Sequence, residues 1–191
     1  MNDQGLLLEA LVNTATSLEK HLRLFNPVIN AEKNGIPEAN LITQFAHQCL
    51  NNGWFVYPET SNVVRNSHDG KPIRIDLHVI CEGQFMLTVE AKKLYSIEKA
   101  QEMLSDFKRA QTLNYLHDHN NLPHHVLLLA VTEITSNANW WCASENWDNI
   151  SPTWKELAEI LQRDGVLTSS LPMHDAHGKT HHLLYAISEV H

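Results

Sequence analysis

This sequence lacks any long apolar run. The longest lies at 126–131, which is the length of a strand, whereas a membrane-spanning helix needs about 20 apolar residues. The N-terminal segment, 1–25, has no basic start and carries Glu9 and Glu19 inside its apolar stretch. It is therefore typical of an amphipathic helix and not of a signal peptide. We expect a protein without membrane spans that is located in the cytoplasm.

Cysteine is also scarce. Cys49, Cys81 and Cys142 are odd in number, far apart and without a C-x-x-C pair. This pattern predicts reduced thiols, and it argues against both a disulfide framework and a thiolate zinc site.

Basic residues are outnumbered, because 14 Lys and Arg stand against 22 Asp and Glu, for a formal net charge of −8. This charge argues against a broad basic surface for nucleic acid. The deficit is uneven: residues 62–113 hold eight basic and seven acidic side chains, whereas the rest of the chain holds six and fifteen. We therefore look for chemistry in the nearly neutral centre.

The 191 residues, 43% of them hydrophobic, suit one folded domain. Apolar spacings of three and four residues predict helices, and alternating or β-branched runs predict strands. In chain order they predict a helix at 4–25, a helix at 37–52, strands at 54–60, 73–80 and 85–94, a helix from Ser96 to about 115, a buried strand at 124–132, a helix at 152–162, and strands at 166–171 and 182–190. The expected fold is a single α/β domain, 1–191, whose core at about 37–132 consists of a helix, a three-stranded mainly antiparallel meander, a helix and a strand. An N-terminal helix precedes this core, and an extension at 133–191, a helix plus a β-hairpin, follows it.

The register of the central hairpin follows from burial. Alternating apolar residues mark one face of each strand: Ile75, Leu77 and Val79, and then Phe85, Leu87, Val89 and Ala91. Matching these faces in an antiparallel pair requires opposite residue numbers to have an even sum, such as 166. The turn then has an odd count, such as 82–84, or contains a bulge. A sum of 166 sets three polar pairs opposite each other on the other face: Asp76 with Glu90, Arg74 with Lys92, and His78 with Thr88.

Asp76 and Glu90 would repel each other in this register. Like charges directly across a strand pair destabilise by up to about 1 kcal/mol unless a cation lies between them. Their hard oxygen ligands suit Mg²⁺ or Mn²⁺, which polarises a phosphodiester and helps to deprotonate water. Lys92 on the same face can orient the nucleophile or stabilise the developing charge. The cluster therefore predicts a hydrolytic site.

A family resemblance lies in two segments. They are RIDLHVI, which contains Asp76, and FMLTVEAKK, which contains Glu90, Ala91 and Lys92. Together with the order of helix, three strands, helix and strand, they resemble the PD-(D/E)XK or restriction-endonuclease-like nuclease superfamily. The resemblance covers 37–132, about half of the chain, and departs from the nominal motif at Ile75, which replaces its proline. It implies a (deoxyribo)nuclease that cleaves DNA with Mg²⁺ or Mn²⁺, in which Asp76 and Glu90 bind metal and Lys92 is catalytic.

Further residues match the family around this motif. Many members add an acid from the first helix, and Glu38 matches that place as a metal-site acid; its other interpretation is a first-turn acid favoured by the helix dipole. Gln111 and Tyr115 in QTLNY resemble the Q-x-x-x-Y helix signature of the RecB-like and lambda-exonuclease-like branch, although Thr112 stands where that helix usually has an aliphatic residue. Both side chains could instead simply pack or hydrogen-bond. Glu59 is either a further acid of the site or a turn residue after Pro58.

Other interpretations stay open. A catalytically inactive nuclease-fold module that binds a protein partner would suit the net charge of −8. A homodimer is a further option, with helix 4–25 as a candidate surface. Several histidine groups offer the alternative of a zinc site; they are His117 and His119, His124 and His125, and the group His174, His177, His181 and His182. The tryptophans at 140, 141 and 147 are either core anchors or platforms on which nucleic-acid bases stack.

Overall fold

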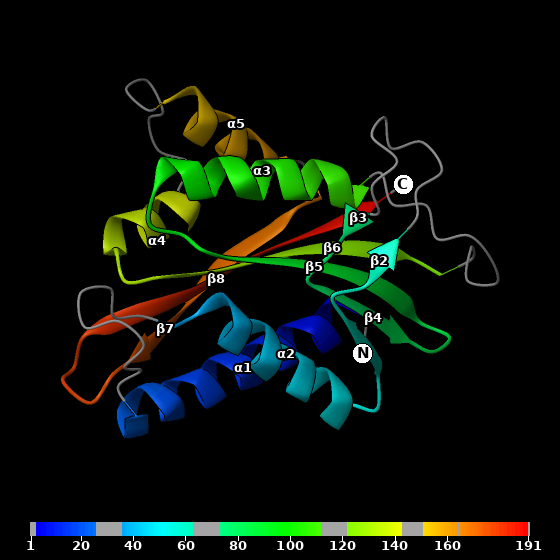
Figure 1. Ribbon diagram of the computed structural model, residues 1–191, viewed down its shortest axis with the longest axis horizontal. Helices are drawn as coiled ribbons and strands as arrows, with labels where there is room; N and C mark the ends of the chain where they lie inside the picture. Colours follow the sequence, from blue (N-terminus) through cyan, green and yellow to red (C-terminus); the bar gives the residue numbers. More distant parts are fainter. Residues whose placement is uncertain are drawn as a thin grey trace.

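The computed structural model describes residues 3–25, 36–62, 73–111, 122–142, 151–163 and 165–190. Within these ranges the protein is a mixed α/β fold of five helices and a six-stranded, mostly antiparallel sheet, accompanied by a two-stranded ribbon (Figure 1). The sheet has the strand order β1-β4-β5-β6-β8-β7. Its neighbouring strands β5 and β6 are parallel, and its other neighbouring pairs are antiparallel.

The elements follow the sequence pattern closely. They are α1 (Asp3–Phe25), α2 (Glu38–Asn51), β1 (Phe55–Pro58), β2 (Ser61–Asn62), β3 (Ile73–Arg74), β4 (Leu77–Cys81), β5 (Phe85–Lys93), α3 (Ile97–Gln111), β6 (His124–Thr132), α4 (Thr135–Cys142), α5 (Pro152–Leu161), β7 (Leu167–His174) and β8 (Thr180–Val190). The predicted C-terminal helix and β-hairpin are confirmed as α5 and β7–β8. Helix α4 was not predicted, and the predicted continuation of α3 to 115 lies outside the described residues.

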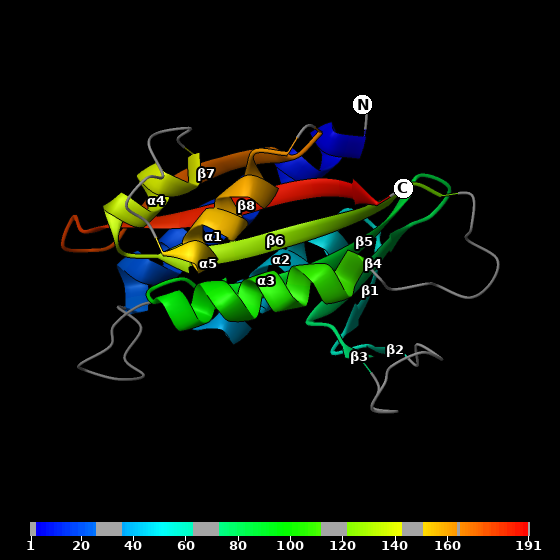
Figure 2. The same ribbon diagram turned by 90° about the horizontal axis from the view of Figure 1, so that it is seen from above.

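Helices cover both faces of the sheet. Figures 1 and 2 show α1 and α2 on one face and α3, α4 and α5 on the other. Strand β6 is buried throughout its middle because it contributes to both cores: Leu127 and Leu129 pack toward α1 and α2, and Val126 and Leu128 pack toward α3 and α5. This two-sided burial explains its continuous apolar run.

The β4–β5 hairpin has the predicted register. Leu77 pairs with Val89 and His78 with Thr88, which gives a residue sum of 166. Strand β4 ends at Cys81 and β5 begins at Phe85, so the turn has the expected three residues. Gly83 in this turn has a φ of 71°, a left-handed conformation that glycine adopts at little cost.

The predicted strand at 73–80 is wrong in one respect, because it breaks before Leu77. Arg74 pairs with Ser61 in the β2–β3 ribbon and not with Lys92. The chain leaves the main sheet where the Glu59 amide donates to the Asp76 carbonyl at 3.0 Å and the Ile75 amide donates to the Thr60 carbonyl at 3.2 Å. These bonds replace the expected ladder, and the ribbon extends away from the sheet (Figure 2).

Helix α3 connects β5 to β6, as a parallel pair requires. Ser96 caps its start, since its hydroxyl accepts from the Lys99 amide at 3.4 Å. The crossover places α3 over the face of β5 that carries Glu90 and Lys92. The charged residues of the strand therefore meet a helix and not open solvent.

The sequence predicts reduced cysteines and no membrane-spanning helix, and the described residues allow both expectations to be compared with the structure. All three cysteines are free thiols, with Cys49 and Cys81 buried and Cys142 exposed. Among the described helices, none combines the length and the apolar character that a membrane span requires.

Candidate active site

The predicted acids and lysine gather where β4 begins and β5 ends. Asp76 lies just before β4, and its Oδ2 accepts a hydrogen bond from the Ala91 amide of β5 at 2.8 Å. That amide stands between Glu90 and Lys92, and the Asp76 charge acts on both of these side chains. The structure therefore brings these three residues together on neighbouring strands.

Glu90 is almost fully buried, with 1% of its surface exposed. Its carboxylate accepts a hydrogen bond from Arg109 of α3 at 3.1 Å. Burial raises the pKa of Glu90 to about 8, the charges of Asp106 and Asp76 add to the rise, and Arg109 opposes it. In the absence of a metal ion, Glu90 therefore keeps its proton to a higher pH than an exposed glutamate does.

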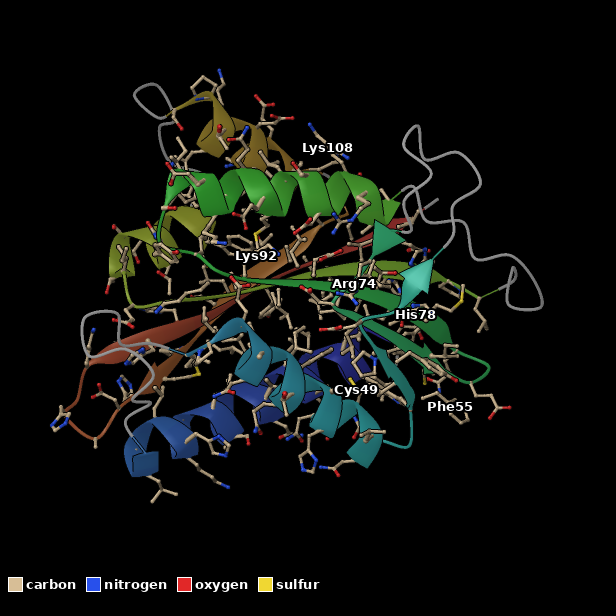
Figure 3. The ribbon with its side chains drawn as sticks, viewed as in Figure 1. Cys49, Phe55, Arg74, His78, Lys92 and Lys108 are labelled. Atoms are coloured by element: carbon tan, nitrogen blue, oxygen red, sulfur yellow. The ribbon has the colours of Figure 1, made fainter. Side chains whose placement is uncertain are left out.

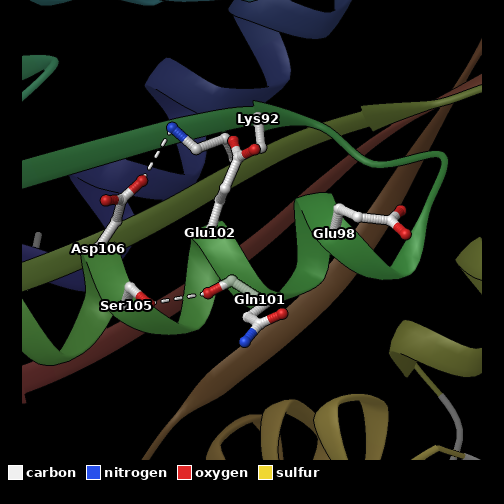
Figure 4. Close-up of a pocket in the computed structure, with 6 residues that line it drawn as sticks. All are labelled: Lys92, Glu98, Gln101, Glu102, Ser105 and Asp106. Atoms are coloured by element: carbon white, nitrogen blue, oxygen red, sulfur yellow. Dashed lines mark hydrogen bonds and ion pairs between the residues drawn. The ribbon is translucent and has the colours of Figure 1, made fainter.

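Lys92 is paired with a second residue of α3. Its Nζ lies 2.8 Å from Oδ2 of Asp106, and both side chains are nearly buried. Asp106 in turn binds Arg109 at 2.7 Å through its other oxygen. We call the series Lys92, Asp106, Arg109 and Glu90 the α3 ion-pair chain; Figure 4 shows its first contact. Burial lowers the pKa of Lys92, but the hydrogen bond and charge of Asp106 and the charges of Asp76 and Glu38 outweigh it and raise the pKa.

Asp106 and Arg109 were not predicted from the sequence. A signal for Asp106 existed, because it falls within the buried stripe of α3 that includes Met103, Phe107 and Ala110. An acid in an apolar stripe needs a partner. The identity of that partner depends on which helix face meets β5.

Glu38 begins α2 and reaches the same end of β5. Its Oε1 accepts from the Lys93 amide at 2.8 Å, and its charge contributes to the raised pKa of Lys92. Glu38 therefore lies near the cluster. Within the described residues, however, no group of three or more His, Cys, Asp or Glu side chains is arranged to hold a metal ion. Asp76, Glu90 and Glu38 are thus not assembled as one three-ligand set.

The donor chemistry still fits a hard divalent cation. Mg²⁺ keeps several waters and is commonly bound through only one or two carboxylates. Asp76 and Glu90 supply two such groups, and Oδ1 of Asp76 makes no hydrogen bond to a described residue. The contact of Glu90 with Arg109 uses Oε1, so a metal ion would be bound through the other carboxylate oxygen, Oε2.

The remaining predicted site residues lie elsewhere. Glu59 is a turn residue with a φ of 48°, and it pairs with Arg74 at 3.5 Å while its side chain stays largely exposed. It does not join the cluster. Gln111 is the last residue of α3 and is half-buried, and Tyr115 lies outside the described residues.

An open pocket of about 580 Å³ adjoins the cluster. It is lined by one lysine, three acids and two neutral polar residues of α3 and β5 (Figure 4): Lys92, Glu98, Gln101, Glu102, Ser105 and Asp106. The acids outnumber the lysine, so an anionic phosphate would be repelled from this pocket unless a cation were bound with it.

The histidine alternative finds no zinc geometry among the described residues. His124 bonds Thr88 at 2.9 Å, and burial together with the neighbouring His125 lowers its pKa to about 4. His181 lies 3.4 Å from Asp175. His117, His119 and Trp147 lie outside the described residues. Of the other tryptophans, Trp141 is buried and donates to the Tyr185 carbonyl at 3.0 Å, which is the behaviour of a core anchor.

Comparisons of the chain with protein-family models, with curated proteins and with solved structures find no match. The function must therefore be inferred from the side chains themselves. Among the described residues, the side chains best suited to catalysis are those of the cluster of Asp76, Glu90 and Lys92 at the end of β5.

Proposed function

We propose that this protein is a metal-dependent nuclease that hydrolyses phosphodiester bonds of DNA with Mg²⁺ or Mn²⁺. The observation that carries the proposal is the bond from the Ala91 amide to Asp76. It fixes one carboxylate beside a second acid, Glu90, and beside Lys92. Two carboxylates can hold a divalent ion that polarises a phosphodiester and activates water, and a lysine beside them can stabilise the charge that develops.

The topology supports a restriction-endonuclease-like core for this proposal. Helix α2 precedes the meander β1, β4 and β5, and α3 then leads to β6, which is parallel to β5. This is the element order on which the family resemblance rests. Strands β7 and β8 extend the sheet beyond β6, on the side away from β1.

Each side chain then has a role. Asp76 and Glu90 would hold the metal, which when bound supplies a Lewis acid for the phosphodiester and lowers the pKa of water. Lys92 orients the attacking water and stabilises negative charge that develops on the phosphate. Glu38 accepts from the Lys93 amide and so holds the end of β5, where Lys92 projects.

The test compares two lysines on opposite sides of α3. Figure 3 shows Lys92 on the sheet side of this helix and Lys108 on the other side, where Lys108 pairs with Glu156. Lys92→Ala should lower Mn²⁺-dependent cleavage of circular and linear DNA by about 10²-fold or more, and Lys108→Ala should leave it unchanged. Chelation with EDTA should abolish the cleavage. Equal cutting by the wild type and Lys92→Ala would refute the role of Lys92.

A second candidate is a nuclease-fold module that binds a protein partner and has no catalytic activity. The α3 ion-pair chain favours it, because Lys92 and Glu90 already have partners in the absence of metal. Calorimetric titration with Mn²⁺ separates the two candidates. Binding that disappears in Asp76→Asn, together with DNA cleavage, supports the nuclease; absence of both binding and cleavage supports the module.

A further inference from the structure

Helix α3 directs two charged residues, Asp106 and Arg109, at the sheet. The proposed hydrolysis assigns no role to either of them. Asp106 is 8% exposed and lies one helical turn before Arg109, which is partly buried. These residues form the middle of the α3 ion-pair chain. They connect Lys92 with Glu90 through three contacts of 2.8, 2.7 and 3.1 Å.

The contacts of Asp106 are specific. Its Oδ2 pairs with Lys92 and its Oδ1 pairs with Arg109, so each carboxylate oxygen has its own cation. Burying an ionised carboxylate is unfavourable unless it is paired and hydrogen-bonded. Replacing Asp106 by an apolar side chain would leave the ammonium group of Lys92 and the guanidinium group of Arg109 without their shared carboxylate, so these charged groups depend on one another.

A catalytic lysine needs a partner such as a carboxylate to hold its ammonium group in one position. It has four rotatable bonds and a compact charge, and it adopts many conformations unless something holds it. Lys92 is held at its tip by Asp106, with 13% of its side chain exposed. Catalytic groups lose efficiency steeply when they move away from the reacting atoms.

We propose that Asp106 is a positioning residue that holds the ammonium group of Lys92 at the reaction site. This inference rests on the proposed nuclease function. In this role Asp106 acts through Lys92. It also keeps Arg109 in place beside Glu90, so that one carboxylate of α3 orders both ends of the site.

The kinetic test uses Asp106→Asn, which keeps the shape of the side chain and removes its charge. We expect kcat for Mn²⁺-dependent DNA cleavage to fall about 10- to 100-fold, with KM changed by less than about threefold, because substrate contacts are not removed. Asp106→Glu should recover part of the loss, since it restores the charge. Glu156→Gln is the matched control: Glu156 pairs with Lys108 on the outer side of α3, and its variant should keep the kcat of the wild type.

A second measurement does not depend on cleavage. Acetylation of Lys92 by acetic anhydride, followed by mass spectrometry of peptides, should be several-fold faster in Asp106→Asn than in the wild type or in Glu156→Gln. Thermal unfolding shows whether each variant is folded during labelling. A variant that does not fold is replaced by Asp106→Glu, which should label at a rate between those of the wild type and Asp106→Asn.

The outcomes separate the two levels of inference. An active wild type with unchanged kcat in Asp106→Asn overturns the positioning role alone. Unchanged labelling of Lys92 in folded Asp106→Asn overturns it as well. A wild type without metal-dependent cleavage overturns the nuclease function, whereas the labelling result then still reports whether Asp106 holds Lys92.

Discussion

Glu90 couples the site to the stability of the fold. Its pKa is about 8 in the folded protein because of burial and the neighbouring acids, and its ordinary value is about 4.3. The folded state therefore holds a proton that the unfolded state releases between these two pH values. The stabilising contribution is fully present below the lower pKa and is lost as pH rises toward the upper one.

Glu90→Gln should remove this pH dependence. The amide cannot ionise, and its Oε1 can still accept a hydrogen bond from Arg109. We expect the free energy of unfolding of the variant to vary less between pH 5 and about pH 8 than that of the wild type, and to exceed it at the upper end of this range. Urea unfolding at several pH values measures this difference.

The matched control for this prediction is Glu102→Gln, which removes an acid that is about half exposed on the same helix. It should leave the pH profile of stability parallel to that of the wild type. If Glu90→Gln also gave a parallel profile, the burial and the acidic neighbours of Glu90 would have no effect on its protonation, contrary to the geometry of the site.

The turn between β1 and β2 stores backbone strain at one residue. Glu59 adopts a φ of 48°, a left-handed conformation that costs a residue with a Cβ roughly 1–2 kcal/mol. Its ion pair with Arg74 is between largely exposed side chains and contributes little. The glutamate is therefore not required by the local structure.

Glu59→Gly should stabilise the protein relative to Glu59→Ala by about 1 kcal/mol. Both variants lose the ion pair with Arg74, but only glycine relieves the strained backbone, so their difference isolates the strain. Chemical denaturation measures it. Both variants should retain DNA cleavage at the wild-type level, and a loss of cleavage in both would place Glu59 in the site after all.

The β4–β5 hairpin could be predicted because apolar residues alternate with other residues along both of its strands. The apolar face of each strand admits one register parity, which places Glu90 and Lys92 on the same face of β5. Asp76 instead lies just before β4 and is held beside them by the Ala91 amide. The β2–β3 ribbon could not be predicted, because hydrogen bonds donated by the backbone amides of Glu59 and Ile75 redirect the chain. Such bonds depend on the position of β1 and leave no pattern in the sequence.

Helix α4 and the α3 ion-pair chain were missed for a related reason. The segment of α4, TSNANWWC, has weak helix formers, and tertiary contacts such as the bond from Trp141 to the Tyr185 carbonyl support it. Asp106 and Arg109 belong to the site only because the crossover places α3 over β5. In both cases contacts between distant segments decide the outcome, and local spacing does not record them.

The charge of the whole molecule limits how it can bind DNA. The net charge is −8, and among the described residues beside the site, Lys92 and Arg109 are already paired with acids. Each neutralised phosphate of duplex DNA contributes about −0.9 to the slope of log K against log salt concentration. A protein that makes two or three such contacts therefore has a slope of roughly −2 to −3.

We accordingly expect weak binding of DNA with a shallow salt dependence in the absence of divalent ions, and tighter binding when Mn²⁺ is present. The physical reason is that the ion bound by Asp76 and Glu90 would offset their negative charge and attract the phosphate. Fluorescence anisotropy of labelled duplex DNA at several KCl concentrations measures the slope, with Lys92→Ala used to prevent cleavage. Asp76→Asn should lose most of the Mn²⁺-dependent gain in affinity, since it removes one proposed ligand. Tight binding without metal and a slope of about −8 would indicate a broad basic surface, which the 14 basic residues of this chain, outnumbered by 22 acids, do not provide.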